Sequence, residues 1–220
     1  MYFYELFHGR ATLPGRVFYD KMNLMSDKKQ IIVMMGGPGV GKGTFSQMLM
    51  SRHPYQHIEA GAILRAEPAE SEIGKLIAAG NLVPDNLVCD LMASCIGDAD
   101  IILDGFPRTL PQAKWLVEHY ASRYCIHVLY FAVSHDVLIA RIKKRVRDGS
   151  LRADDASMEI INRRLSNFES ITMPAVEWLR TAPGIRFSEI DARGDVDDNF
   201  ADIIAALGTR LHPLRNDRDS

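Results

Sequence analysis

A glycine-rich segment that directly follows an apolar run constrains the fold of this chain more than any other feature. Residues 31–35 read Ile-Ile-Val-Met-Met, which is typical of a buried strand, and residues 36–44 read Gly-Gly-Pro-Gly-Val-Gly-Lys-Gly-Thr. Glycines let backbone N–H groups surround a phosphate without a Cβ in the way, and a following helix points unpaired N–H groups at the same anion. The order of strand, loop and helix therefore predicts a phosphate-binding loop, with Lys42 on the outer phosphates of a nucleoside triphosphate.

Composition narrows the class of protein. With 220 residues, 47% hydrophobic and 25% charged, the chain can bury one full core. A net charge of -2 gives no basic field for nucleic acid or anionic lipid, and no apolar run approaches the roughly 20 residues that span a bilayer. Cys89, Cys95 and Cys125 are odd in number and lack metal-ligand spacing, which favours reduced structural thiols in a cytoplasmic protein. We expect neither a nucleic-acid nor a membrane partner.

Short apolar runs alternate with helical patterns along the rest of the chain. The runs predict strands at 31–35, 57–59, 101–104, 126–133 and 185–190. The helical patterns cover about 44–53, 71–80, 85–97, 111–122, 135–147, 157–180 and 196–211. Near-continuous apolar strands separated by helices indicate a parallel sheet covered on both faces. We therefore predict a three-layer α/β/α fold of the P-loop kind, with a central five-stranded parallel sheet.

Unusual residues follow each of the first three predicted strands. The glycine loop follows the first strand, residues 61–65 follow the second, and Asp104 ends the third. Ligands of such sheets bind beyond the carboxyl ends of the strands. In phosphate-loop proteins an acid at the end of a neighbouring strand holds Mg²⁺ or its waters, so Asp104 is the candidate metal residue.

The segment from Asp104 to Gln112 reads Asp-Gly-Phe-Pro-Arg-Thr-Leu-Pro-Gln, and with it the chain resembles the adenylate kinase family of nucleoside monophosphate kinases. The resemblance covers about residues 30–211, and it is extended by Gly-Ala-Ile-Leu-Arg at 61–65, Gly-Asn-Leu-Val-Pro-Asp at 80–85, Arg141, Arg145, the segment 152–155 and Arg164-Leu165. It implies reversible phosphoryl transfer from MgATP to AMP, giving two ADP. It also implies a cytoplasmic role in adenine-nucleotide balance, and we expect a monomer.

The resemblance implies a role for each matching residue. It assigns catalysis to Lys42, Asp104, Arg108, Arg145, Arg152 and Arg164, with Asp104 holding Mg²⁺ through water. It assigns ATP to Gly39, Val40, Gly41, Lys42, Gly43, Thr44, Arg141, Arg145 and Gly194. It assigns AMP to Ala60, Arg65, Asn81, Leu82, Val83, Gly105, Phe106, Pro107, Arg108, Gln112, Arg152 and Arg164. Phosphoryl transfer leaves little covalent work to a protein, so positioning and charge stabilisation dominate.

Two mobile segments are expected within the domain at 30–211. One binds the monophosphate, at about 60–89, and the other is a lid at about 146–156. Only about ten residues separate Arg145 from Asp155 and none is a cysteine, which predicts the short-lid type without structural zinc. Residues 1–29 lack periodicity, and we expect either a disordered extension or a start-codon assignment upstream of Met22 or Met25. Residues 212–220 are polar and are expected to form a flexible tail.

Gln112 is the best indication of which monophosphate binds. A glutamine amide carries both donors and acceptors, which match N1 and the exocyclic amine of adenine. Leu64, Leu82 and Val83 are expected to sandwich the base, although core packing alone would explain them. A preference for CMP or UMP is the alternative, because Ala60 stands where the family commonly has threonine and the pyrimidine-specific relatives also carry alanine.

A second departure concerns the rate. Ala62 stands where the family commonly has an aspartate, and the loss of one preorganised contact costs about 2–4 kcal/mol, or about 30–1000-fold in rate. We expect a working kinase, slowed to that degree if the acid is needed, with a catalytically weak nucleotide sensor as the alternative. The Asp154–Arg164 stretch is one residue longer than the family spacing, which leaves Arg163 and Arg164 as alternatives for one phosphate contact.

Overall fold

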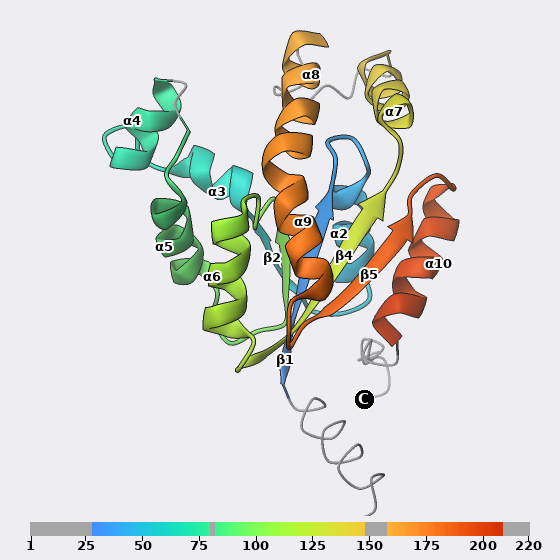
Figure 1. Cartoon of the computed structure of the whole chain (residues 1–220), viewed down its shortest axis with the longest axis horizontal. Coiled ribbons are helices and arrows are strands. Elements are labelled where there is room, and N and C mark those ends of the chain that lie inside the picture. Colours follow the sequence, from blue (N-terminus) through green and yellow to red (C-terminus); the bar gives the residue numbers. More distant parts are fainter. Residues whose placement is uncertain (1–27, 80–81, 148–157, 209–220) are drawn as a thin grey trace, which may run out of the picture.

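A central five-stranded sheet with helices on both faces forms the body of the computed structural model, which describes residues 28–79, 82–147 and 158–208 (Figure 1). The strands are β1 (Lys29–Gly36), β2 (Gln56–Glu59), β3 (Ile101–Asp104), β4 (Tyr124–Ala132) and β5 (Arg186–Asp191). The helices are α2 (Lys42–Met50), α3 (Ala60–Ala66), α4 (Glu72–Ala78), α5 (Asp85–Cys95), α6 (Leu110–Tyr120), α7 (His135–Arg147), α8 (Met158–Asn167), α9 (Met173–Thr181) and α10 (Val196–Leu207).

All strand pairs are parallel, in the order β2-β3-β1-β4-β5. The pairing brings the carboxyl ends of β1, β2 and β3 together, because Met34 of β1 and Glu59 of β2 both lie in register with Asp104 of β3. The predicted fold class and all five predicted strands are confirmed. The unusual residues that follow the first three strands therefore share one edge of the sheet.

Two buried clusters cover the two faces of the sheet, which explains the near-continuous apolar strands. Alternate β1 residues Ile31 and Val33 pack against α5, α6 and α9, whereas Ile32 and Met34 pack against α2, α7, α8 and α10. Strand residues at alternate positions point to opposite faces, so a strand with helices on both sides must be apolar throughout. β1 is therefore the buried centre of the fold. The glycine loop follows directly from this buried strand.

Several helices begin where the sequence supplies a cap. Ser71, Thr109 and Asp195 accept hydrogen bonds from the backbone N–H groups of Gly74, Gln112 and Asp198, respectively. Such caps satisfy donors that the first helical turn leaves unpaired. The short helix α3 was not predicted, and its first residue, Ala60, follows Glu59 of β2 without an intervening loop. Helix α3 and helix α4 form an arm that stands beside the sheet (Figure 1).

The predicted helix at 157–180 is interrupted by a π-helical turn, η2 (Phe168–Thr172), between α8 and α9. In an uninterrupted α-helix, Leu165 and Leu179 would lie only about 40° apart around the axis, at about 100° per residue. Leu165 instead packs in the cluster with α2 and α10, and Leu179 packs in the cluster with α5 and α6. The wider turn rotates α8 relative to α9, so one rod of helix contributes to both faces of the sheet.

Candidate nucleotide-binding site

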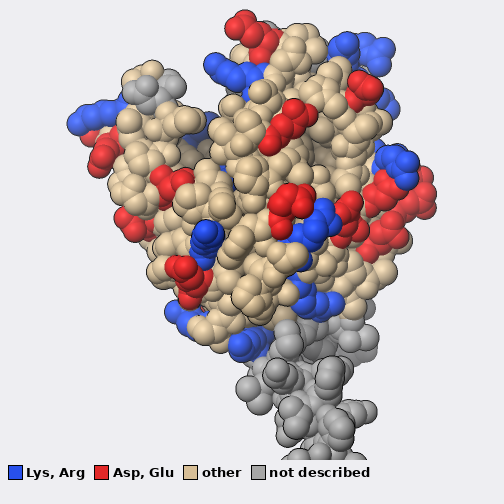
Figure 2. Space-filling model, viewed as in Figure 1, with Lys and Arg blue, Asp and Glu red and all other residues tan. Residues whose placement is uncertain are grey.

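A cavity of about 690 Å³ opens at the shared edge of β1, β2 and β3. That volume lies in the range of ligand pockets. Its walls come from the glycine loop, the α3 arm, the segment after β3 and the α8–η2 rod, and Figure 2 shows the surface hollowed between the arm and this rod. The lining residues given a role from the sequence are Gly39, Gly41, Lys42, Gly43, Thr44, Ala60, Leu64, Arg65, Leu82, Val83, Asp104, Gly105, Pro107, Arg108, Gln112 and Arg164.

The glycine loop has the conformation that a phosphate cradle needs. Gly39 and Gly41 have φ angles of 85° and 106°, a region that other residues rarely adopt, and a Cβ at Gly39 would stand 2.7 Å from Cγ1 of Ile142. Helix α2 begins at Lys42 with Gly41 as its N-cap and no side-chain cap, so the first N–H groups of the helix are not covered by a side chain. Lys42 Nζ donates to the carbonyls of Gly36 at 2.7 Å and Gly37 at 3.2 Å. The ammonium is thus folded over the loop.

Two guanidinium groups converge on the opposite side of the cavity. A Cβ at Gly61 would stand 3.1 Å from Nη1 of Arg65 and 3.8 Å from Nη2 of Arg108. Arg108 Nε also donates to the carbonyl of Gly105 at 3.0 Å, where φ is 81°. Planar guanidinium groups match phosphate oxygens in bidentate fashion. The pair is therefore suited to a phosphate that lies above Gly61 and Gly105.

Gln112 is buried beside this arginine pair and is fixed at both ends of its amide. Its Oε1 accepts from the backbone N–H of Arg108 at 2.8 Å, and its Nε2 donates to Asp85 Oδ1 at 2.7 Å. Because an N–H can only donate and a carboxylate here accepts, these partners fix the orientation of the amide. Thr109 Oγ1 donates to Asp85 Oδ2 at 2.9 Å. An amide has two donors and two acceptor sites, so one of each stays available to a ligand.

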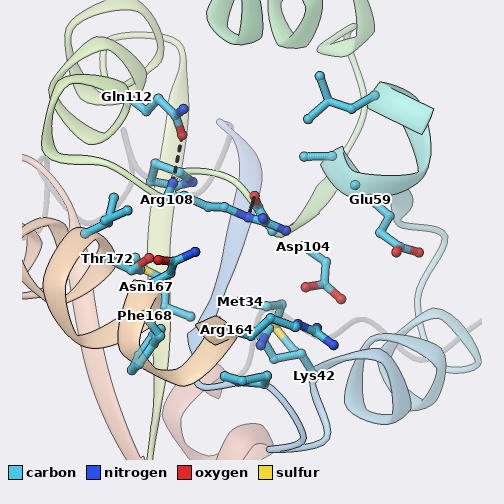
Figure 3. A pocket seen from close by; sticks show the side chains of 18 of the residues that line it. Met34, Lys42, Glu59, Asp104, Arg108, Gln112, Arg164, Asn167, Phe168 and Thr172 are labelled. Atoms are coloured by element: carbon cyan, nitrogen blue, oxygen red, sulfur yellow. Dashed lines mark hydrogen bonds between the residues drawn. The ribbon is translucent and has the colours of Figure 1, made fainter. Parts of the chain in front are cut away.

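Acidic side chains lie at the ends of two neighbouring strands. Asp104 and Glu59 are the last residues of β3 and β2 and both line the cavity, and Figure 3 shows their side chains on the side away from Gln112 and Thr172. Asp104 shares the cavity with Lys42 and Thr44 of the glycine loop. A single carboxylate, a hydroxyl and substrate phosphates form a typical Mg²⁺ environment, because this ion keeps several of its waters. These residues therefore fit a magnesium ion that arrives with a triphosphate.

Four described residues with roles expected from the sequence do not line the cavity. Val40 and Phe106 are buried, at 2% and 1% exposure, and do not line the cavity. Arg141 donates to the carbonyls of Ala192 at 2.6 Å and Gly194 at 3.3 Å, outside this cavity. The structure thus places Arg141 and Gly194 next to each other and away from the arginine pair, and their role in binding ATP stays a prediction. Asn81, Arg152 and the Arg145 side chain lie outside the described residues.

The alternatives Arg163 and Arg164 are separated by the structure, because Arg164 lines the cavity and Arg163 is an exposed residue that does not. Ala62 is also exposed and is not part of the lining. Several lining residues were missed from the sequence, namely Glu59, Asp85, Thr109, Asn167, Phe168, Ile171 and Thr172. Asp85 and Thr109 could have been found as the polar neighbours of Gln112, whereas the residues around η2 follow from a helix irregularity that no local signal marks.

The three cysteines are free thiols, as expected. Burial, together with Asp85 and Asp90, raises the pKa of the Cys89 thiol to about 11, so this group stays protonated and unreactive at neutral pH. Within the described ranges, His, Cys, Asp and Glu side chains form no group of three that could hold a metal ion. The absence of zinc stays a prediction. No helix in the described part of the chain is long and apolar enough to cross a bilayer.

The sequence is also similar to that of known proteins. A family model described as adenylate kinase matches residues 34–183. The chain is 37% identical over 187 residues to an adenylate kinase of Bacteroides thetaiotaomicron, covering 80% of this chain and 97% of the relative. It is 35% identical to adenylate kinases of Bacteroides fragilis and Bartonella bacilliformis, with 81% and 80% of this chain covered and 98% of each relative.

Proposed function

The chain belongs to the adenylate kinase family, and on this premise we propose that it transfers a phosphoryl group reversibly from MgATP to AMP, giving two ADP. One observation carries the proposal: Lys42 on its glycine loop, Asp104 and the pair Arg65 and Arg108 all face one cavity. The glycine loop with Lys42 can bind one phosphate chain and the arginine pair can bind the other, as transfer between two nucleotides requires. Asp104 can bind the metal ion between them. Relatives that are named adenylate kinases cover most of the chain.

On the donor side, the backbone N–H groups of residues 39–44 hold the ATP phosphates, and Lys42 follows the migrating group. Asp104, through water, and the Thr44 hydroxyl hold Mg²⁺, which supplies charge neutralisation when it is bound. The contact between Arg141 and Gly194 supports a role for both on the ATP adenine. Arg145, Arg152 and Arg164 neutralise the transferring phosphate, and the place of Arg164 in the cavity wall supports its part in this.

On the acceptor side, Arg65 and Arg108 bind the monophosphate, and the remaining donor and acceptor of Gln112 read adenine. Leu64, Leu82 and Val83 cover the base, with Ala60 and the backbone of residues 105–107 beside it, and Asn81 completes this half. Leu82 is 81% exposed in the cavity wall, which supports a contact made only with nucleotide bound. The segment at about 60–89 and the lid at about 146–156 close over the nucleotides and exclude water.

The choice of AMP is tested by mixing purified protein with MgATP and each of AMP, CMP, UMP and GMP, and following the formation of ADP. The expected result is turnover with AMP that exceeds UMP and GMP at least tenfold, because uracil and guanine present a ring N–H where adenine presents the N1 acceptor to the free donor of Gln112. Cytosine has the same acceptor and amine pattern as adenine, so AMP against CMP is the decisive comparison, and we expect AMP to be faster. Faster turnover with CMP or UMP would overturn this choice and give Ala60 the deciding role.

The sensor alternative depends on Ala62. Because Ala62 is exposed and lies outside the cavity lining, we expect Ala62→Asp to change the turnover number by less than about threefold, within ordinary surface effects. A sharp gain in rate would instead show that the unmodified chain lacks a needed acid. We further propose a monomeric, cytoplasmic enzyme that acts in adenine-nucleotide balance, which the three free cysteines support.

A further inference from the structure

Glu59 lies at a helix N-cap but does not cap the helix. It is the last residue of β2 and the N-cap of α3, and its side chain makes no capping hydrogen bond. Serine, threonine, aspartate and asparagine are preferred at an N-cap because their short side chains reach the free N–H groups of the first turn. The Glu59 carboxylate does not stabilise the helix as a cap. Any role of this carboxylate therefore depends on another contact.

That contact lies at the far end of the same helix. Glu59 Oε1 stands 3.6 Å from Nη2 of Arg65, in the last turn of α3, and both residues line the cavity. A carboxylate that positions an arginine approaches it at about 2.7–2.9 Å, often with two parallel hydrogen bonds. The Glu59 contact is longer and involves one oxygen, and the two side chains are 41% and 53% exposed. Such a pair lowers the local charge, and a contact of this length is too weak by itself to hold the guanidinium in one geometry.

The charge that Glu59 lowers is the charge that binds phosphate. Arg65 places Nη1 next to Gly61, where Arg108 Nη2 also lies, and places Nη2 next to Glu59. A phosphate bound there in bidentate fashion through both Nη groups therefore competes with Glu59 for Nη2. We propose that Glu59 is a competing anion built into the acceptor site, which the monophosphate displaces from Arg65 when it binds. This inference rests on the proposed function. It assigns Glu59 a specificity role, because only a ligand with more charge than one carboxylate gains by the exchange.

The consequence falls on AMP more than on ATP. A carboxylate near a phosphate dianion repels it, and the repulsion is weakened by the water and salt around half-exposed groups. The glycine loop follows β1, and β3 lies between β1 and the strand β2 that ends in Glu59. The ATP phosphates are therefore expected to bind next to Lys42 and farther from Glu59. Removal of the Glu59 charge is therefore expected to tighten AMP binding and to leave ATP binding nearly unchanged.

The test compares Glu59→Gln with Glu67→Gln. Glutamine keeps the length of the side chain and removes its charge, and Glu67 follows the same helix without lining the cavity. AMP binding is measured by titration calorimetry without ATP, at low and high salt, and KM for each nucleotide is measured with kcat. Glu59→Gln is expected to lower the AMP dissociation constant by about three- to tenfold at low salt and by less at high salt. Glu67→Gln is expected to match the unmodified protein.

Two results overturn the proposal. Weaker or unchanged AMP binding in Glu59→Gln would show that the carboxylate positions Arg65 or does nothing for the acceptor. A fall in kcat with a raised Mg²⁺ requirement and unchanged AMP affinity would place Glu59 with Asp104 at the metal. The calorimetric readout keeps this test separate from the proposed function, because an unmodified protein that binds AMP but forms no ADP rejects the kinase activity and leaves the Glu59 comparison intact.

Discussion

The side-chain carbonyl of Gln112 accepts the backbone N–H of Arg108 at 2.8 Å. The residue proposed to read the base thus holds the residue proposed to bind the phosphate, and Asp85 fixes the other end of the amide at 2.7 Å. One buried side chain therefore connects the two residues proposed for base and phosphate recognition.

Replacement of Gln112 by alanine is expected to act on AMP rather than on ATP. The change removes the amide, so Asp85 Oδ1 and the Arg108 N–H lose their Gln112 contacts, and lost hydrogen bonds to charged groups cost about 1.5–3 kcal/mol. KM for AMP should rise about 10–100-fold with little change in KM for ATP, measured by varying each nucleotide at saturation with the other. Lys114→Ala, at an exposed site on the same helix, is the control. An equal loss for both nucleotides would contradict the assignment.

Lys42→Met should slow the chemical step. The ammonium now bonds the carbonyls of Gly36 and Gly37 and is expected to follow the migrating phosphoryl group. Loss of one preorganised charge contact in the transition state lowers kcat about 10²–10³-fold. Single-turnover formation of ADP measures the effect, with Lys75→Met, at an exposed position on α4, as the matched control. Full activity in Lys42→Met would remove the lysine from the mechanism.

Gly74→Ala is expected to destabilise the arm formed by α3 and α4. A Cβ at Gly74 would stand 2.0 Å from the backbone carbonyl oxygen of Pro68, so the backbone must move to accept even one methyl group. Overpacking of this kind costs about 1–3 kcal/mol. AMP affinity should fall because the arm rearranges, while the midpoint of thermal unfolding of the sheet changes little. Gly97→Ala is the control, because a Cβ there meets nothing within 4 Å. Equal AMP affinity of the two variants would argue against this packing.

Stability should fall in mild acid because of His127. Burial, assisted by Arg186, lowers the pKa of His127 in β4 from 6.5 to about 4. Between these pH values the unfolded chain binds the proton more readily, so the stabilisation is present above about pH 6.5 and is lost as the pH falls toward 4. The shift corresponds to about 3 kcal/mol at most. Denaturant unfolding at several pH values measures the loss.

Two comparisons isolate the contribution of this group. His127→Gln should flatten the pH dependence between 4 and 6.5, whereas His119→Gln, on the exposed side of α6, should not. If the His127 variant does not fold, an NMR titration of the unmodified protein decides the matter. A ring that gains its proton near pH 6.5 would contradict the buried, neutral state.

Much of the fold could be predicted from the sequence because each strand carries its own signal. β1 is apolar from Ile31 to Met35 because helices cover both of its faces, and the glycines that follow need φ values that other residues avoid. Helix α3 could not be predicted, because it is one short turn-like element that follows a strand without a linker. The π-helical turn could not be predicted for another reason. It lets Leu165 and Leu179 pack in different clusters, and that requirement arises only from the packing of the whole molecule.

The candidate site shows the same division. Lys42, Asp104, Arg108 and Gln112 belong to contiguous motifs, and each of them lines the cavity. Glu59 belongs to no motif, and its meaning comes from the strand register that sets it beside Asp104 and from a helix that ends in Arg65. The importance given to Ala62 came from the family pattern, and only the folded structure shows that this residue is exposed and does not line the cavity.

The way the arm is attached has a thermodynamic consequence. The buried residues of α4, Ile73 and Gly74, belong to neither of the two core clusters, and among the buried residues of those clusters α3 contributes only Ala60. Ile63 and Leu64 of α3 are only partly buried against the first cluster. We therefore expect the arm to detach as a separate cooperative unit at a lower free-energy cost than global unfolding, with β1 and the glycine loop intact. Substitutions in the arm then adjust how often the acceptor half is assembled, and leave the melting of the sheet almost untouched.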